Sequence, residues 1–213
     1  MKVSNYKLIQ ETSLSAIIFV SFFLVFSGCG KREIANTHSN GKNIICFGDS
    51  ITFGYGVDSK ESYPVFLGKL AQRTVINAGI DGDTSTEALK RLESDVLSRD
   101  PFLVIVEFGG NDFLRKVPLV ETVRNINEIV EKIQAKGVMV AITDISAGLL
   151  MKEYRLPYKK IAQEKGAIFI PSIMSGIITN PRMKSDFFHP NDTGYSLIAE
   201  RVFHSIKPYI NKD

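Results

Sequence analysis

A serine stands where an apolar run of strand length breaks into a glycine-rich loop. Residues 44–47 are wholly apolar, and Gly48-Asp49-Ser50-Ile51 follows at once. A serine hydroxyl is nearly inert at neutral pH and becomes a nucleophile only when a neighbouring base removes its proton. Gly-Asp-Ser alone is common, so Ser50 gains meaning only if the chain also supplies a base, a group that orients the base, and donors for an oxyanion.

Three histidines are available as the base. His38 lies in a polar segment near the N-terminus, and His204 lies late in a segment of helical period. His189 stands in a non-helical segment, and Asp186 precedes it by three residues. In a tight turn this carboxylate can accept a hydrogen bond from one imidazole nitrogen, which fixes the tautomer and stabilises the imidazolium. We expect His189 to be the base and Asp186 its orienter; the alternative for both is a surface turn before a helix cap.

Two strand ends that contain glycine offer hydrogen-bond donors. Gly109 and Gly110 allow a sharp turn after an apolar run, so that the Asn111 side-chain amide can point into a site. Gly79 follows another run and presents a backbone N–H with no side chain in the way, and Ser50 can add its own N–H. Each preorganised donor to an oxyanion is typically worth about 10²–10³ in rate. Singly, each of these positions is also an ordinary turn.

Apolar runs of strand length alternate five times with longer segments of helical period. The central runs lack the polar alternation of a half-exposed strand, which is typical of a parallel sheet covered on both faces. The chain is therefore predicted to be an α/β protein. Strands are expected at 43–48, 74–78, 102–108, 138–143 and 167–170, and helices at 62–72, 84–97, 119–136, 152–165 and 191–206.

These elements place the candidate residues on one edge of the sheet. Ser50 follows the first strand, Gly79 the second and Asn111 the third, while Asp186 and His189 follow the last. In open parallel α/β sheets the ligand lies outside the carboxyl ends of the strands, where the connecting loops converge. We therefore expect all of these residues to meet in one site.

The four segments also carry a family resemblance. Gly48-Asp49-Ser50, Gly79, Gly109-x-Asn111-Asp112 and Asp186-x-x-His189 resemble, in order and context, the four sequence blocks of the SGNH (GDSL) hydrolases. The resemblance covers residues 43–208, and the stretch 106–115 looks most like the branch of arylesterases, thioesterases and lysophospholipases.

This resemblance implies a fold, a mechanism and residue roles. The fold would be a flavodoxin-like three-layer sandwich with a five-stranded parallel sheet of order 2-1-3-4-5. Ser50, Asp186 and His189 would be catalytic, and Ser50, Gly79 and Asn111 would form the oxyanion hole, with no metal and no cofactor. The reaction would be hydrolysis of small-molecule or lipid esters through an acyl-enzyme.

Two departures from that family pattern concern the substrate. Phe187-Phe188 is bulky where family members often have a small residue, so the rim near His189 is expected to be narrow or apolar. The segment 144–151 lacks the proline-rich turn common in that branch. Its apolar residues 145–151 could face the substrate or pack on the sheet, and acyl-chain preference stays open.

The N-terminus has the pattern of a lipoprotein leader. Lys2 and Lys7 precede an apolar run over 14–26, which is too short for a spanning helix. Ser27-Gly28-Cys29 resembles a lipobox, although Phe26 stands where leucine is usual. We expect a signal peptide over 1–28, lipidation of Cys29, a flexible tether over 29–42 and a hydrolase domain over 43–213. The protein would be exported and membrane-anchored, at the periplasmic face or cell surface; an uncleaved anchor or ordinary signal peptide is the alternative.

Composition excludes several other classes. The net charge is +3, and no basic cluster is interleaved with aromatic residues, so no nucleic-acid partner is expected. The glycines between 48 and 56 fit neither a Walker loop nor a dinucleotide fingerprint. No metal-ligand spacing is evident. The second cysteine, Cys46, lies in a strand-like run and is expected to be a small buried hydrophobe.

Three functional hypotheses follow from these residues. The first is an acyl-ester hydrolase of the arylesterase or lysophospholipase type. The second is an O-acetyl esterase acting on carbohydrate or peptidoglycan, since the same machinery serves acetylated sugars. The third is a surface lipoprotein that keeps the fold for binding without catalysis, against which the intact candidate residues argue.

Overall fold

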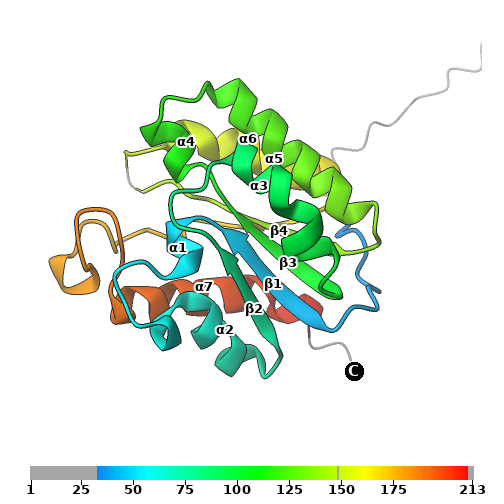
Figure 1. The fold of residues 1–213 in the computed structure, drawn as a ribbon, viewed down its shortest axis with the longest axis horizontal. Coiled ribbons are helices and arrows are strands. Elements are labelled where there is room, and N and C mark those ends of the chain that lie inside the picture. Colours follow the sequence, from blue (N-terminus) through cyan, green and yellow to red (C-terminus); the bar gives the residue numbers. More distant parts are fainter. Residues whose placement is uncertain (1–32, 148, 211–213) are drawn as a thin grey trace, which may run out of the picture. The chain divides into compact units, whose positions relative to one another are not determined.

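A computed structural model describes residues 33–147 and 149–210 of the chain (Figure 1). The predicted signal peptide over 1–28 and the predicted lipidation site Cys29 lie outside the described residues. Within the described residues, no helix is both long enough and apolar enough to cross a membrane.

Five parallel strands form the central sheet in the order β2-β1-β3-β4-β5. The predicted α/β fold and strand order are thereby confirmed. Each strand lies within two residues of its predicted bounds. The strands are β1 (Asn43–Gly48), β2 (Val75–Gly79), β3 (Pro101–Glu107), β4 (Met139–Thr143) and β5 (Ile168–Ile170).

Helices cover both faces of the sheet. Figure 1 shows α2 (Tyr63–Ala71) and α7 (Asp192–Ile210) on one face, and α3 (Ser85–Leu92), α5 (Leu119–Gln134) and α6 (Lys152–Lys165) on the other. A single π-helical turn, Glu93–Leu97, continues α3. At the start of α7, the Asn191 side chain accepts from the Gly194 N–H at 3.1 Å. The three-layer prediction is thus confirmed.

Alternate residues of each strand enter different cores. In β1, Ile44 and Cys46 pack with α2 and α7, whereas Ile45 and Phe47 pack with α3, α5 and α6. All four side chains are fully buried. This explains why the strands read as continuous apolar runs, because side chains on both sides of the pleat are covered. Cys46 is the expected buried hydrophobe, and burial raises the pKa of its thiol to about 12.

The described part of the predicted tether packs on the domain. The Ala35 N–H donates to Gly166 O at 2.8 Å, and the Asn36 amide donates to Gln134 O and Val138 O, both at 3.0 Å. Sequence polarity predicts flexibility over 29–42. In the structure, the polar Asn36 side chain instead donates to the carbonyl of Gln134, at the end of α5, and to that of Val138, directly before β4.

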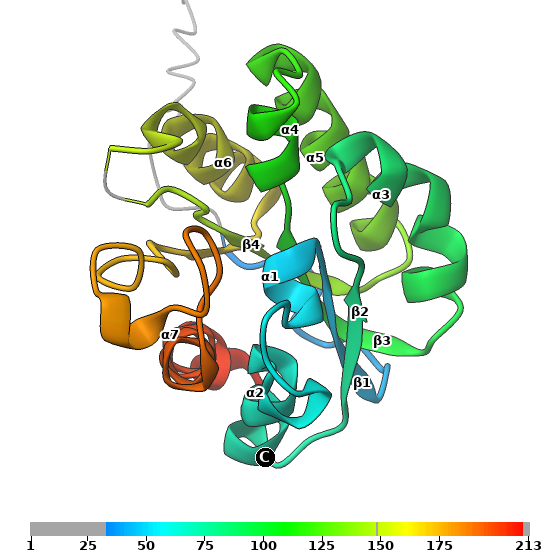
Figure 2. The same cartoon turned by 60° about the vertical axis from the view of Figure 1, so that its left-hand side comes forward.

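Two short helices that periodicity does not predict begin the loops at the carboxyl edge of the sheet. They are α1 (Ser50–Phe53), directly after β1, and α4 (Gly110–Leu114), soon after β3. Two 3₁₀ turns, Ser59–Glu61 and Pro181–Met183, lie in the connections before α2 and α7. Figure 2 brings forward the side of the domain on which α1, α4 and the segment before α7 lie.

Candidate active site

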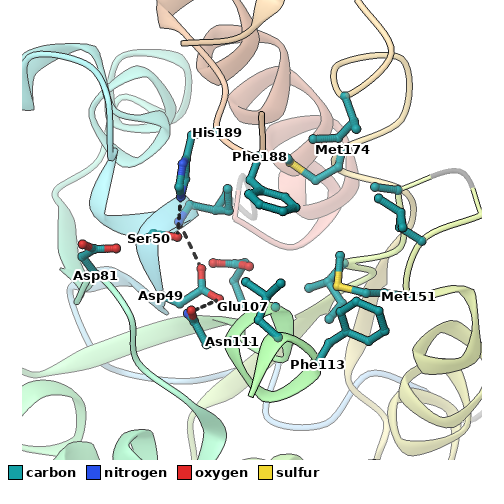
Figure 3. A pocket seen from close by; sticks show the side chains of 17 residues that line it. Asp49, Ser50, Asp81, Glu107, Asn111, Phe113, Met151, Met174, Phe188 and His189 are labelled. Carbon is teal, nitrogen blue, oxygen red and sulfur yellow. Dashed lines mark hydrogen bonds between the residues drawn. The ribbon is translucent and has the colours of Figure 1, made fainter. Parts of the chain in front are cut away.

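The predicted serine, histidine and aspartate meet in one hydrogen-bonded row. Ser50 Oγ lies 3.1 Å from His189 Nε2, and His189 Nδ1 lies 2.7 Å from Asp186 Oδ2 (Figure 3 shows the first of these contacts). Both distances are within hydrogen-bond reach. The row joins the loop after β1 to the loop before α7, which are 139 residues apart in sequence.

Backbone contacts hold the aspartate and the histidine in a tight turn. Asp186 Oδ1 accepts from the N–H groups of Phe188 and His189, each at 2.8 Å. Desolvation acts to raise the pKa of Asp186, but the hydrogen bonds from His189 and Phe188 outweigh it and hold the pKa below its usual value. Asp186 therefore stays a carboxylate that can orient His189. The Tyr55 ring packs against the imidazole, with centroids 4.4 Å apart.

Ser50 is the first residue of α1, and its environment is built by the preceding residue. Asp49 caps this short helix, because its Oδ1 accepts from the Ile51 N–H at 3.0 Å. The Ser50 side chain is almost buried, at 8% exposure. Among the described residues, the Ser50 N–H has no hydrogen-bond acceptor. It is therefore free to donate to a bound oxyanion.

Asn111 reaches the same site from α4. Gly109 turns the chain with φ of 121°, a conformation that favours glycine, and this turn sets the start of the helix. One N–H of the Asn111 amide donates to Asp83 O at 3.0 Å, while the contact to Asp49 Oδ2 is long, at 3.4 Å. The amide is thus oriented by the loop after β2 and keeps one proton only weakly bound.

Gly79 is not in this site. It does not line the cavity, and its N–H already donates to Asn77 Oδ1 at 2.9 Å. Beyond the end of β2, the loop 80–83 reaches the cavity instead. Asp81 lines the cavity, and Asp83 O holds Asn111. The prediction of Gly79 as an oxyanion donor is corrected accordingly.

Gly82 lies between those two residues. Its φ is 80°, and its carbonyl accepts from Arg115 Nη2 at 2.7 Å. No acceptor for the Gly82 N–H is found in the described part of the chain. The sequence carried a signal for this position, because Gly82 is the only residue of Asp81-Gly82-Asp83 that takes a positive φ without strain.

A buried pair of acids behind the serine was missed from sequence. Asp49 and Glu107 are each 2% exposed, and Glu107 also lines the cavity. Burial raises the pKa of Asp49 to about 6. Burial, and then the charge of Asp49, raise the pKa of Glu107 well above its usual value. Both shifts favour the protonated form of these buried acids.

The two acids are in side-chain contact. Glu107 hydrogen-bonds Asp49 through its side chain, and Glu107 Oε2 accepts from Thr52 Oγ1 at 2.9 Å. A hydrogen bond donated to the Asp49 carboxylate reduces the negative charge on the carboxylate oxygen that lies near the Asn111 amide. Glu107 thus limits the repulsion that an oxyanion beside Asn111 would meet.

Apolar side chains form most of the cavity beside Ser50. Figure 3 shows them on the side of the serine away from Asp81. The segment 145–151, whose role the sequence left open, contributes Ile145, Ala147, Leu150 and Met151 to the lining. Phe188 also lines it, which agrees with the expected apolar rim, whereas Phe187 does not. Other apolar members are Phe113, Leu114, Met174 and Ile178.

Asp144 ties together the two loops that supply this lining. Its side chain is fully buried and accepts from the Ser146 N–H at 3.0 Å and the Ser172 N–H at 3.1 Å. Arg155 lies 3.3 Å from Asp144 Oδ2. The loop after β4 and the loop after β5 are therefore fixed to one carboxylate.

The remaining histidines lie elsewhere. His38 lies in the segment before β1 and His204 lies in α7, and neither lines the cavity. Among residues 33–147 and 149–210, no group of three or more His, Cys, Asp or Glu side chains could hold a metal ion.

Comparisons with known proteins agree with this geometry. The model of the GDSL-like lipase/acylhydrolase family matches residues 46–197. The chain is 29% identical to thioesterase 1/protease 1/lysophospholipase L1 of Escherichia coli over 187 residues, which cover 80% of this chain and 86% of that protein. It is 27% identical to esterase TesA of Pseudomonas aeruginosa, covering 88% of this chain and 98% of that protein. The crystal structure of psychrotrophic esterase EstA from Pseudoalteromonas sp. superimposes with a TM-score of 0.72 at 28% identity, covering 80% and 100%.

Proposed function

Because the chain belongs to the GDSL-like lipase/acylhydrolase family and is an ester hydrolase, we propose that it cleaves acyl esters with medium to long acyl chains through an acyl-enzyme on Ser50. The alcohol component would be of the arylester or lysophospholipid type. The observation that carries this substrate class is the apolar cavity that opens directly beside Ser50 Oγ.

Ser50 and His189 perform the proton transfers. Ser50 Oγ attacks the acyl carbonyl as His189 Nε2, 3.1 Å away, takes its proton. His189 then gives this proton to the leaving alcohol, which departs and leaves the acyl group on Ser50. A water molecule, deprotonated by His189, attacks the acyl-enzyme and releases the carboxylic acid. Asp186 holds the imidazole in orientation and stabilises its charged form throughout.

Three donors would stabilise the oxyanion. Ser50 N–H and the Asn111 amide are the predicted donors, and the Gly82 N–H takes the place predicted for Gly79. Support for Gly82 comes from its unpaired N–H and from its position between Asp81, which lines the cavity, and Asp83, which holds Asn111. Each such donor contributes about 10²–10³ in rate.

The cavity favours an acyl chain over an acetyl group. An acetyl group offers one methyl, whereas Phe113, Met151 and Met174 line a space well beyond the serine. Each buried methylene contributes about 0.8 kcal/mol of transfer free energy, so affinity should grow with chain length until the space is filled. Relatives named as a lysophospholipase and an esterase are consistent with such substrates.

A series of p-nitrophenyl esters from acetate to decanoate tests this proposal. We expect kcat/KM to rise from acetate to the middle of the series, and Ser50→Ala to abolish turnover on every ester. Wild-type turnover by Ser50→Ala would end the proposal. A maximum at acetate, with acetate release from cell-wall polymers, would favour the O-acetyl esterase instead. A failure of Ser50 to react with a fluorophosphonate would favour the non-catalytic binding protein.

Lipid anchoring at Cys29 remains a separate proposal that rests on the sequence of residues 1–29. It predicts an exported protein, held on a membrane at the periplasmic face or cell surface. Cells grown with labelled palmitate should incorporate the label into the wild type and not into Cys29→Ala. Label that persists in Cys29→Ala would rule out this attachment site.

A further inference from the structure

Three separate segments that contribute to the cavity lining also carry exposed apolar side chains. Leu114 in α4 is 54% exposed, Leu149 before α6 is 84% exposed, and Phe187 before α7 is 69% exposed. Leu150 and Phe188, beside the last two, are also exposed. We call these five residues the apolar rim. Side chains of this size seldom gather on a free surface without a partner.

The rim is continuous with the cavity but extends beyond it. Leu114, Leu150 and Phe188 line the cavity, whereas Leu149 and Phe187 do not. Phe187 packs edge-on against Phe188, with ring centroids 4.8 Å apart. Leu149 and Phe187 therefore do not contact a substrate bound in the cavity, and their exposure indicates a different partner.

Cationic side chains flank each part of the rim. Lys116 lies two residues after Leu114, and Lys152 follows Met151. Arg115, which lies between Leu114 and Lys116, instead donates to Gly82 O at 2.7 Å and lies 3.8 Å from Glu87. Lys184 Nζ lies 5.4 Å from the centre of the Phe187 ring. Exposed apolar residues bordered by lysine suit a surface that is apolar below and anionic above, because each cation near an anionic bilayer contributes about 1 kcal/mol.

We propose that the apolar rim docks on an anionic phospholipid bilayer and sets the cavity mouth against it. This inference rests on the proposed function, since a lipid ester with a long acyl chain resides in such a surface. Phe187 and Leu149 enter the lipid, the flanking cations meet its headgroups, and the acyl chain passes into the cavity without exposure to water. A protein partner would also cover apolar residues, but it would not supply an acyl chain to the cavity that Leu114, Leu150 and Phe188 line.

The absence of tryptophan from the chain allows a direct test. Phe187→Trp in the full chain carries a single reporter on the rim. With vesicles of phosphatidylcholine and phosphatidylglycerol, its emission should shift to the blue, and lipids brominated on the acyl chains should quench it. Vesicles of phosphatidylcholine alone should give a weaker effect because the cations lose their partners.

Leu70→Trp is the matched control. Leu70 is 40% exposed near the end of α2, which runs back to the opposite edge of the sheet. It should show neither shift nor quenching. Attachment through the N-terminal segment alone would leave both reporters in water, so the test separates docking from anchoring. Equal behaviour of the two reporters would overturn the proposal.

Kinetics separate this inference from the proposed function. The double variant Phe187→Ser with Leu149→Ser should hydrolyse monomeric p-nitrophenyl butyrate at the wild-type rate. On lysophospholipid embedded in the anionic vesicles it should lose roughly tenfold or more, as expected when two large side chains no longer enter lipid. Leu70→Ser should match the wild type on both substrates. An unchanged vesicle rate in the double variant would refute rim docking, whereas butyrate hydrolysis that does not need Ser50 would refute the proposed function.

Discussion

Asp186 binds His189 twice, once through each carboxylate oxygen. Asp186 Oδ2 lies 2.7 Å from Nδ1 of the imidazole, and Asp186 Oδ1 accepts the backbone N–H of the same histidine at 2.8 Å. The carboxylate therefore fixes both the backbone turn and the ring. Because its side chain is 42% exposed, water can partly replace it when it is removed.

Asp186→Asn tests this double contact. The amide keeps one oxygen to accept from the backbone but no longer stabilises the imidazolium. We expect kcat on p-nitrophenyl butyrate to fall by roughly 10³-fold, somewhat less than for a fully buried triad aspartate. KM and the thermal midpoint should hardly change, since the residue is near the surface. A rise in KM with an unchanged kcat would show that Asp186 acts in substrate binding rather than by orienting His189.

A structure of the phosphonylated enzyme would locate the oxyanion donors. The phosphonyl oxygen on Ser50 should lie about 2.7–3.1 Å from Ser50 N, Gly82 N and Asn111 Nδ2. Asn111→Ala should lower kcat by about 10²–10³, because one of these donors is lost. A phosphonyl oxygen bonded to Gly79 N instead would require Asn77 to release that N–H, and would restore the sequence-based assignment.

Much of the fold followed from sequence because both faces of the sheet are buried. Ile44 to Phe47 alternate between two cores, and the resulting unbroken apolar run identifies a covered parallel strand. The helix predicted over 119–136 ends at Gln134, two residues early, and Gly137 follows it with φ of 75°. Ser50, Asn111, Asp186 and His189 could be placed together because the carboxyl ends of parallel strands share one edge.

The parts that sequence missed depend on contacts between distant residues. Asp49 reads as part of a turn and Glu107 as the polar end of a strand, and only the fold buries them together. Gly79 was predicted because periodicity locates the end of a strand, whereas the path of the loop beyond it, which carries Gly82, cannot be read from periodicity. Asn36 was assigned to a flexible tether because the two carbonyl groups that it binds lie about a hundred residues away in the sequence.

Ala147→Leu should shorten the preferred acyl chain. Ala147 lines the cavity and is 7% exposed, so a larger side chain there occupies space that a long chain would use. We expect kcat/KM for decanoate to fall on the order of tenfold relative to butyrate, the scale of one or two misplaced methylenes. Ala135→Leu, the same change at the exposed end of α5, should leave the chain-length profile unaltered. Equal losses on butyrate and decanoate would argue against an acyl cavity at Ala147.

Asp144→Ala should weaken the fold and the cavity together. It removes the acceptor of two backbone N–H groups and the partner of Arg155. Buried groups that lose such a partner cost about 2–4 kcal/mol of unfolding free energy. Urea unfolding should show this loss, and KM for long esters should rise as the two loops loosen. Arg155→Ala should cost no more than about 1 kcal/mol, because that side chain is half exposed.

Glu107→Gln should preserve activity and change the pH dependence of stability. Glutamine keeps an oxygen for Thr52 and an N–H for Asp49, so it imitates the protonated acid. We expect kcat/KM near pH 7 to stay within about threefold of wild type, the scale of one retained hydrogen bond. Glu107→Leu, which removes both contacts, should lower kcat by at least about tenfold through the misdirected Asp49 and Asn111.

The sign of the stability change follows from the raised pKa values. Folded Asp49 and Glu107 bind protons more tightly than the unfolded chain does, so the folded state holds more protons above about pH 4. Their contribution is full below that pH and is lost as the pH rises through their folded pKa values. Glu107→Gln removes the contribution of Glu107 to this loss. The free energy of unfolding of this variant, measured in urea, should therefore fall less than that of the wild type between about pH 5 and about pH 9. Glu128→Gln is the control, because Glu128 forms an exposed surface pair with Lys132, and this variant should follow the wild type. Parallel curves for wild type and Glu107→Gln would show that Glu107 is ionised in the folded protein across this range.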